Sequence, residues 1–551
     1  MARITGVAVL LVSLCAGAWS LRLEPKPFWI PGSDASYNVT GTIRLPYAEI
    51  VEPFTVLYDG PNGRGRVDYY NGIQRVISKV KTPELPYGVT LKIIPFSTQK
   101  VLNKISCFSA NGSQEMPTEL TVIFPDTTDF KYVGKGAVRG LPCKMYQKVV
   151  TVGKKKSTYT MAVTDDAASL PVRYEMMGYD SLLGSHYDKY YVDYLEFHDH
   201  VTFSDADFEV PPSMKCGPYP GPGMKAKKIL LDPIREFIHH QEDHMHEEFE
   251  IFKKVHGKTY DDAEHESRKH IFRQNLRYIS SKNRAGLSYT LAVNHMADRT
   301  ESEMKVMRGF RYSHGPRGGK TFSMLQIPRN DVPDQWDWRL QGAVTPVKDQ
   351  AICGSCWSFG TTGTIEGANF LKTGNLVRLS QQELVDCAWG FGNNGCDGGE
   401  DFRSYGYMLA NGGLTSEEQY GQYLAIDSFC KKNSVTPVVQ ITNYTTLPQG
   451  DLNALKVALF NYGPISVAID ASHKSFGFYS DGVYYDPACK SDPDSLDHAV
   501  LAVGYGVMDN QAYWLVKNSW STHWGNDGYV LMSQKNNNCG VATDATYVDI
   551  K

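Results

Sequence analysis

The chain has 551 residues, which is too long for one hydrophobic core, since single cores rarely grow beyond about 250–300 residues. Its 42% hydrophobic and 21% charged residues are ordinary for globular protein and exclude long disordered stretches. The formal net charge of -4 gives no reason to expect nucleic acid or an anionic membrane as a partner.

Residues 1–20 have the pattern of an export signal. Arg3 supplies a positive charge, an apolar run follows, and small residues around Ala18 offer a cleavage site. The run is too short to span a bilayer, and no other segment approaches about 20 apolar residues. We therefore expect a soluble protein of the secretory pathway, either extracellular or endolysosomal. Three N-glycosylation motifs fit that route, at Asn38, Asn111 and Asn443.

Residues 21–215 are expected to form a β-rich domain. Short runs of β-branched and aromatic residues alternate there with clusters of Gly, Pro, Asn and Asp. Together these runs predict an antiparallel sheet or a barrel. They are Asn38–Leu45, Phe54–Tyr58, Leu91–Pro95, Leu120–Phe124, Tyr146–Val152 and Thr158–Val163.

The tyrosines of this domain leave two interpretations open. An aromatic run can line a ligand groove, but more often it forms core and sheet surface. The run consists of Tyr187, Tyr190, Tyr191 and Tyr194. The region carries no catalytic constellation, and its sequence does not indicate a ligand.

The cysteines of the β-rich domain are expected to pair, as is usual in an oxidising compartment. Cys107 and Cys143 can bridge two strands, which leaves Cys216 without an evident partner.

A linker is expected at residues 216–231, which are rich in proline and glycine and contain the basic tract Lys225–Lys228. An exposed basic tract of this kind invites proteolytic nicking. From residue 232 to 325 the pattern becomes helical, because large apolar residues recur at spacings near three and four.

Six residues of this helical segment reproduce an interrupted motif: Glu264, Arg268, Phe272, Asn275, Ile279 and Asn283. The motif is the ERFNIN motif, and residues 232–325 therefore resemble the inhibitory propeptides of cathepsin-L-like papain-family proteases. A second motif of those propeptides is matched with Ala292 and Met296 in place of its Gly and Phe. The resemblance implies a zymogen that is inhibited by its own propeptide.

Histidines gather in this propeptide-like segment: His239, His240, His244, His246, His256, His265, His270 and His295. Our hypothesis is that their charging near pH 5–6 loosens the propeptide. The first four can also suggest zinc, but helical spacing places only some of them on one face and no cysteine joins them. We expect no metal and no cofactor.

Cys356 is the candidate nucleophile of residues 326–551. It lies where a glycine-rich turn runs into an apolar, helix-like segment, and N–H groups at a helix start stabilise a thiolate. A nucleophilic Cys needs a base, and the base needs an orienting group. His498 and Asn518 follow downstream, and Gln350 offers an amide that can help to hold an oxyanion.

The motifs around these residues resemble those of papain-family cysteine proteases. The resemblance implies an α+β fold with a helical left domain around Cys356 and a β-rich right domain carrying His498 and Asn518. Cys356 would attack the peptide carbonyl, Asn518 would orient His498, and Trp520 would shield that contact from water. A Cys/His acyltransferase and a protein that acts mainly by binding through its β-rich domain are the alternatives.

The resemblance also implies disulfides and substrate contacts. Spacing alone leaves fifteen cysteine pairings open, whereas the family pattern pairs Cys353 with Cys396, Cys387 with Cys430, and Cys489 with Cys539. Substrate-binding candidates are Gly398, Gly399, Glu400, Asp401, Ala468, Leu496, Asp497, Trp520 and Asp544.

Asp544 carries the specificity prediction. By family resemblance it closes the pocket for the second substrate residue upstream of the cut, with Glu400 and Asp401 at the rim and apolar walls from Ala468 and Leu496. Carboxylates at the end of a buried pocket favour a cation, so we predict tolerance of Arg or Lys there. The alternative is that Asp544 turns to solvent or forms a local hydrogen bond.

The whole chain resembles the two-chain cathepsins of insect haemocytes. That resemblance implies that an N-terminal β chain stays associated with the mature protease. Expected partners are therefore protein or peptide substrates, the propeptide and this β chain.

Overall fold

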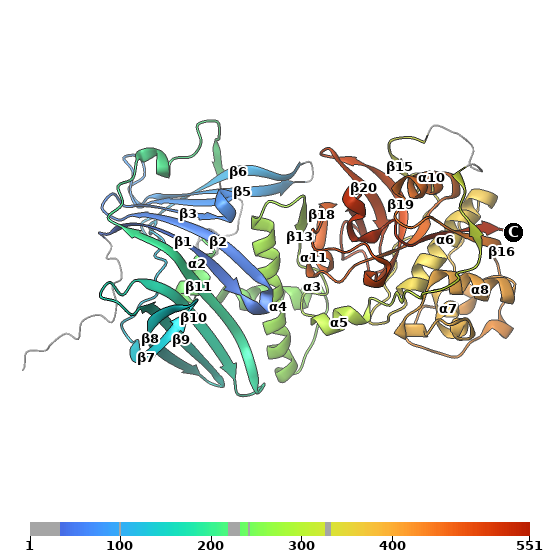
Figure 1. Ribbon diagram of the computed structural model, residues 1–551, viewed down its shortest axis with the longest axis horizontal. Coiled ribbons are helices and arrows are strands. Elements are labelled where there is room, and N and C mark those ends of the chain that lie inside the picture. Colours follow the sequence, from blue (N-terminus) through green and yellow to red (C-terminus); the bar gives the residue numbers. More distant parts are fainter. Residues whose placement is uncertain (1–33, 99–100, 219–231, 241–242, 325–331) are drawn as a thin grey trace, which may run out of the picture.

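The computed structural model describes residues 34–98, 101–218, 232–240, 243–324 and 332–551. The export signal, the basic tract Lys225–Lys228 and residues 326–331 at the start of the catalytic region lie outside this part of the chain. Figure 1 shows a large N-terminal sheet on the left and a second body of strands and helices on the right, with the long helix α4 between them.

The N-terminal body is an open sheet of 12 strands in the order β12-β6-β5-β4-β3-β2-β1-β11-β10-β9-β8-β7. Strands β1 to β6 and β7 to β11 form two antiparallel meanders, which β1 and β11 join by antiparallel pairing. The strands are β1 Ser36–Leu45, β2 Ile50–Asp59, β3 Arg64–Tyr69, β4 Gln74–Lys79, β5 Val89–Thr98, β6 Val101–Asn111, β7 Lys131–Val138, β8 Leu141–Val152, β9 Lys155–Thr164, β10 Pro171–Asp180, β11 Ser185–Asp199 and β12 Cys216–Pro218.

Alternation of buried and exposed side chains explains why these runs form strands. In β1 every second residue is buried, as expected for a strand with one face on a core. Tyr190 and Tyr194 are buried in that core, so these tyrosines of the run belong to the packing and not to an open groove.

The strand predicted at Leu120–Phe124 is wrong. The segment has no strand partner, although Ile123 and Phe124 are buried. A side chain takes the place of a backbone hydrogen bond between strands, because the Tyr194 hydroxyl donates to the Ile123 carbonyl at 2.7 Å. Residues 120–124 therefore form a buried loop, although their composition is typical of a strand.

The suggested bridge between Cys107 and Cys143 is also wrong. Cys107 is bonded to Cys216, because the edge strand β12 runs parallel to β6 and places the two residues opposite each other. Cys143 lies on β8 at the other end of the sheet and is a buried free cysteine.

The short helix α2, Ile234–His239, packs onto the N-terminal sheet. The Tyr69 hydroxyl accepts from the Ile234 N–H at 3.1 Å, and the Tyr190 hydroxyl donates to the Phe237 carbonyl at 2.9 Å. Ile234 and Phe237 are buried. This start of the propeptide-like segment therefore contacts the β-rich body.

The rest of the propeptide-like segment runs from the sheet to the second body. Its elements are α3 Asp243–Val255, α4 Asp262–Arg284, β13 Tyr289–Leu291, α5 Glu301–Val306 and β14 Lys320–Thr321. Asp261 caps α4 by accepting from the Glu264 N–H, as an N-cap aspartate does.

The second body holds a sheet of 10 strands in the path β13-β18-β21-β20-β19-β17-β22-β16-β14, with β15 beside β19. The propeptide-like segment supplies the strands at both ends, β13 and β14. The others are β15 Trp336–Asp337, β16 Ile441–Thr446, β17 Ile465–Ile469, β18 Tyr479–Tyr484, β19 His498–Met508, β20 Gln511–Lys517, β21 Tyr529–Ser533 and β22 Ala545–Ile550.

The helices of the second body lie in different places around its strands: α6, α7 and α8 at the right, α10 near β15, and α11 near β18 (Figure 1). They are α6 Cys356–Thr373, α7 Gln381–Cys387, α8 Asp401–Asn411, α9 Glu417–Tyr420, α10 Leu452–Tyr462 and α11 Lys474–Gly477. Together with the strands they give the α+β fold expected from the sequence. Among the described residues, no helix is both long and apolar enough to cross a membrane.

Candidate active site

Cys356 is the first residue of α6, so its thiol lies at a helix N-terminus as the sequence predicted. The side chain is fully buried, and Sγ accepts from the N–H of Ala499 at 3.4 Å. Ala499 follows His498 at the start of β19, so the helix and the sheet meet at this thiol.

His498 and Asn518 are brought together by the antiparallel strands β19 and β20. His498 Nε2 lies 2.8 Å from Asn518 Oδ1, which fixes the orientation of the ring. The Trp520 ring lies 4.7 Å from the imidazole, centre to centre, and is buried. His498 Nδ1 has no hydrogen-bond partner within the described part of the chain and remains for an exchange of protons.

The main chain of the propeptide-like segment passes directly over the thiol. The Gly309 N–H donates to Cys356 Sγ at 3.3 Å. A Cβ at Gly309 would lie 1.7 Å from the Gly354 carbonyl oxygen, so only glycine fits this close approach. Gly309 could not be recognised in the sequence, because one glycine in a loop carries no pattern.

Gln350 binds a carbonyl of the same segment. Its Nε2 donates to the Met307 carbonyl at 2.8 Å, and the Ser519 hydroxyl donates to its Oε1 at 2.6 Å. Ser519 therefore fixes which way the amide points. The amide is fully buried and presents a donor to a peptide carbonyl inside the cleft.

The glycines that follow Cys396 hold the segment like a neighbouring strand. The Gly399 N–H donates to the Gly309 carbonyl at 2.9 Å, and the Gly399 carbonyl accepts from the Arg311 N–H at 3.2 Å. Gly398 has φ +121° and faces the same carbonyl. Across the cleft the Asp497 carbonyl accepts from the Phe310 N–H at 3.0 Å. Extended polypeptide therefore fills the cleft.

The covered cleft keeps the thiol and the imidazole neutral. Burial raises the pKa of Cys356 to about 11, against the effect of the N–H groups that point at its sulfur. Burial also lowers the pKa of His498 to about 4, against the hydrogen bond with Asn518. The thiolate–imidazolium pair expected of a working enzyme is thus disfavoured while the segment stays in place.

The predicted acidic pocket is occupied by an arginine of the propeptide-like segment. Arg317 forms an ion pair with Asp544 and lies 3.5 Å from Glu400. Its guanidinium also stacks over the rings of Tyr312 and Phe402, at 4.7 and 5.4 Å from their centres. Asp544 therefore points into the pocket and not to solvent. Sequence reasoning missed Arg317, which stands alone among glycines and a proline.

The other residues predicted to line this pocket are buried. Ala468 and Leu496 are buried in one apolar cluster, and the Ala468 N–H donates to the Asp544 carbonyl at 2.9 Å. Asp401 is buried and accepts from the Thr546 hydroxyl at 2.5 Å. Burial and the neighbouring Asp401 raise the pKa of Asp544 to about 7, against the effect of Arg317.

A second propeptide arginine, Arg308, binds beside His498. Its Nε lies 2.9 Å from Asp497 Oδ2 and its Nη2 lies 2.6 Å from Glu301. Asp497 thus contacts the propeptide-like segment through both its backbone and its side chain. The sequence analysis predicted Asp497 only as a substrate-binding residue.

The disulfides of this body are Cys353–Cys396, Cys387–Cys430 and Cys489–Cys539, the pairing that the family resemblance implied. Of the three glycosylation candidates, Asn111 is exposed, whereas Asn38 and Asn443 are half-buried within strands.

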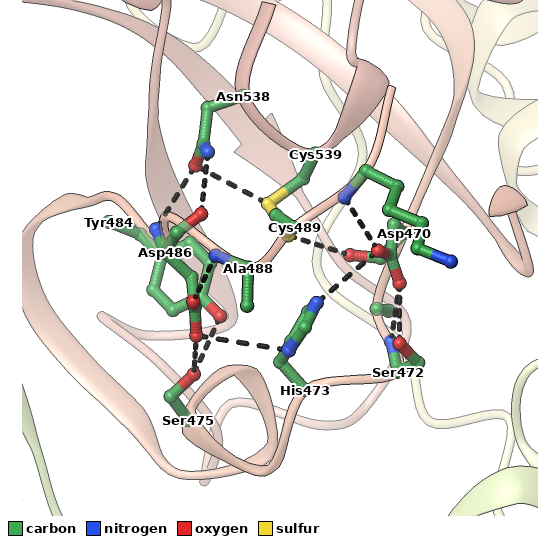
Figure 2. The surroundings of a disulfide bond; sticks show 12 residues. Asp470, Ser472, His473, Ser475, Tyr484, Asp486, Ala488, Cys489, Asn538 and Cys539 are labelled. Atoms are coloured by element: carbon green, nitrogen blue, oxygen red, sulfur yellow. Dashed lines mark hydrogen bonds and ion pairs between the residues drawn. A yellow bond between two sulfur atoms is a disulfide. The ribbon is translucent and has the colours of Figure 1, made fainter. Parts of the chain in front are cut away.

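The disulfide Cys489–Cys539 lies beside His473, which is held between two carboxylates (Figure 2). His473 Nε2 is 3.3 Å from Asp470 and its Nδ1 is 3.9 Å from Asp486.

Replacing His473 by glutamine is expected to destabilise the mature body most at acidic pH. The bond with Asp470 raises the pKa of His473 above its usual 6.5. A raised histidine pKa contributes stability that is complete below about pH 6.5 and is lost as the pH rises through the folded value. We expect a loss of about 1–3 kcal/mol at pH 5, measured by urea unfolding, and a smaller loss at pH 8. An equal loss at both pH values would contradict this, and the exposed His523→Gln serves as the control.

A buried thiol at a helix start, an oriented imidazole and a blocked polypeptide cleft are the arrangement of a latent cysteine hydrolase. Two family models match the chain. "Papain family cysteine protease" covers residues 332–549 and "Cathepsin propeptide inhibitor domain (I29)" covers residues 249–304.

Curated relatives and solved structures agree with these models. Digestive cysteine proteinase 1 of Homarus americanus is 50% identical over 307 residues, 54% of this chain and 93% of that protein. Cathepsin L2 of Homo sapiens is 43% identical over 308 residues, 54% of this chain and 91% of that protein. Procathepsin L2 from the Tenebrio molitor larval midgut aligns with a TM-score of 0.52 and 36% identity, over 55% of this chain and 99% of that one. The recombinant stem bromelain precursor aligns with a TM-score of 0.51 and 36% identity, over 56% and 100%.

The chain therefore belongs to the papain family of cysteine proteases. It is a cathepsin-L-like zymogen that carries its own inhibitory propeptide. This membership favours peptide hydrolysis over the acyltransferase alternative.

Proposed function

We propose that the mature enzyme is an endopeptidase that cuts peptide bonds through a Cys356–His498–Asn518 site. Cys356 attacks the scissile carbonyl as a thiolate, and Gln350 donates to the resulting oxyanion. His498, oriented by Asn518, protonates the leaving amine, and water hydrolyses the thioester. The observation that carries this proposal is the polypeptide already held in the cleft, with one N–H on the thiol and one carbonyl on the Gln350 amide.

Alkylation with iodoacetamide tests the proposal. In the zymogen Cys356 is buried and its thiol pKa is raised, so labelling is expected to be slow. After acid maturation, one equivalent of label on Cys356 is expected to abolish peptide hydrolysis. Full activity after stoichiometric labelling of Cys356 would contradict the assignment.

The pocket that ends at Asp544 is proposed to accept Arg or Lys in the second substrate residue upstream of the cut. Arg317 supports this, because its guanidinium reaches Asp544 and lies over the ring of Phe402, and both residues belong to the catalytic body. A guanidinium that pairs with a carboxylate and stacks on rings is well suited to such a pocket. The propeptide arginine would compete with substrates of this kind.

Acid is proposed to activate the zymogen partly through histidines at the contact between propeptide and catalytic body. The rings of His256 and His295 lie 5.6 and 6.0 Å from that of His523, near Lys258 and Arg299. Burial and these cations lower the pKa of His295 to about 3. Asp298 also faces this group, but Lys258 neutralises its charge at 2.9 Å.

The sign of this effect favours release in acid. A histidine freed to solvent charges near pH 6.5, whereas the buried one charges only near pH 3. The bound state is therefore fully stabilised above about pH 6.5 and weakens as the pH falls toward 3.

The double variant His256→Gln/His295→Gln is expected to self-activate only at a lower pH, by about half a unit or more. The reason is that fewer protons are taken up when the propeptide is released. Rates of mature-enzyme formation between pH 4 and 7 measure it, with His200→Gln as control because His200 is 92% exposed. An unmoved activation profile would refute the histidine mechanism.

The N-terminal β chain is proposed to stay with the processed protein through the propeptide, in the secretory pathway or an acidic endolysosomal compartment. Within the described residues, Leu102 of the sheet lies close to Gly482 of the catalytic body. The propeptide bridges the two, because Asn103 donates to the Leu287 carbonyl at 2.6 Å and β13 pairs with β18.

A further inference from the structure

Helix α4 has two polar faces that serve different parts of the molecule. The ERFNIN residues lie on one side and bond within the propeptide: Asn275 donates to the Ala297 carbonyl at 2.8 Å, and Arg268 pairs with Glu303 at 2.8 Å. A second stripe recurs at intervals of four, three, four and three: His270, Gln274, Arg277, Ser281 and Arg284. At about 100° per residue, the two sets lie on roughly opposite sides of the helix.

The second stripe is bound by two buried carboxylates of the N-terminal sheet. Asp188 on β11 accepts two hydrogen bonds from Arg277, at 2.9 and 3.0 Å, and one from Gln274 at 3.0 Å. Glu52 on β2 forms a bidentate pair with Arg284, at 2.8 and 2.6 Å, and accepts from Ser281 at 2.6 Å. Both strands flank β1, so the two carboxylates lie on neighbouring parts of one sheet.

Further contacts extend this interface along the helix. The Tyr187 ring stacks on His270 at 5.2 Å, and the Tyr70 hydroxyl lies 2.6 Å from Ser281. Glu236 of α2, which packs on the sheet, pairs with Arg277 at 2.7 Å. The N-terminal body therefore contacts residues along the whole second stripe of α4.

Burial makes these carboxylates specific for a cationic partner. Asp188 is 0% and Glu52 is 1% exposed, and a buried carboxylate without a paired cation is strongly unfavourable. Arg277 and Arg273 hold the pKa of Asp188 down to about 2, although burial alone would raise it. The Asp188–Arg277 pair therefore stays ionised at acidic pH. His270 in the same interface opposes it there, because burial lowers the pKa of this histidine to about 3.

We propose that the N-terminal β-rich domain is a receptor for the propeptide helix: Asp188 and Glu52 bind a helix that presents arginines seven residues apart, here Arg277 and Arg284. The ligand of the N-terminal domain is then the second stripe of α4, which is not used by the ERFNIN contacts within the propeptide. On maturation the propeptide piece that contains α4 stays with the β chain and away from the opened active site.

The test uses the full chain with a tag before residue 34 and Cys356→Ser, so that it cannot cut itself. Sites for a sequence-specific protease replace residues 241–242 and 325–331, and Arg308→Ala with Arg317→Ala loosens the catalytic side. After cleavage and capture on the tag at pH 5, the fragment 243–324 is expected to remain with the β chain. Loss of this fragment in the wash would overturn the proposal.

Adding Arg277→Gln/Arg284→Gln is expected to reduce the retained fragment at least tenfold. Because Arg277 is buried and its loss can disturb α4 itself, Asp188→Asn/Glu52→Gln places the change on the sheet, with the same expected loss. The matched control Lys155→Gln removes a half-exposed pair with Glu266 in the same interface and is expected to change retention by less than twofold. Unchanged retention in both double variants would overturn the proposal. Retention does not require catalysis, so this outcome is independent of the proposed peptidase mechanism.

Discussion

Gln350→Ala is expected to lower the kcat of the mature enzyme by about 10²–10³, with little change in KM. The Gln350 amide is buried, held by Ser519 at 2.6 Å, and already donates to a peptide carbonyl at 2.8 Å. A donor fixed in a dry cleft stabilises the developing oxyanion more than the ground-state carbonyl, so its loss affects the chemical step. Steady-state kinetics on a fluorogenic peptide measure both parameters.

Ser519→Ala is the matched comparison for this prediction. It removes the bond that orients the Gln350 amide but keeps the donor, so a smaller loss of kcat is expected. A loss below about tenfold for Gln350→Ala, or a change confined to KM, would mean that the amide only contributes to binding.

Asp544→Asn is expected to reduce the preference for Arg over Leu in the second upstream substrate residue by about 10- to 150-fold. The range corresponds to the roughly 1.5–3 kcal/mol of one hydrogen bond to a charged group. The ratio of kcat/KM for two peptides that differ only at this residue measures it. Asparagine keeps the size of the side chain, so the walls formed by Ala468 and Leu496 remain.

The same pocket predicts how selectivity depends on pH. Burial and the neighbouring Asp401 raise the pKa of Asp544, whereas Arg317 of the propeptide lowers it. In the mature enzyme, which lacks Arg317, we expect the ionised fraction of this carboxyl to grow between pH 5 and pH 7. The Arg-to-Leu ratio of the unmodified enzyme is therefore expected to rise over this interval. Asp549→Asn, which removes another carboxylate on the strand β22 that follows Asp544, is the control. A ratio that neither Asp544→Asn nor pH changes would refute the acidic pocket.

Much of the candidate site could be predicted because its residues carry local patterns. Cys356 follows a glycine-rich turn, His498 starts a strand that contains glycines, and Asn518 lies two residues before Trp520. Each residue is therefore recognisable in the sequence. Arg308 and Arg317 could not be found in this way. They lie in a mostly irregular segment that also carries Lys305, Arg311 and Lys320, and only the folded chain shows that Arg308 meets Asp497 and Arg317 meets Asp544.

The N-terminal body shows a similar division. Alternating side chains predict its strands, but pairing of β1 with β11 depends on contacts distant in sequence. The same cause explains the error at Cys107, whose true partner Cys216 lies 109 residues away. The second stripe of α4 was present in the sequence as a helical period, yet its meaning required Asp188 and Glu52, which no motif marks.

Trapping the acyl-enzyme identifies the nucleophile of the mature protease. The acid-matured enzyme is mixed with the p-nitrophenyl ester of an N-acylated amino acid, quenched in acid within a turnover and analysed by mass spectrometry. We expect one acyl group, carried as a thioester on Cys356 and absent from Cys356→Ala. An acyl group on another residue, or rapid hydrolysis with no acylated Cys356 at any time, would contradict it.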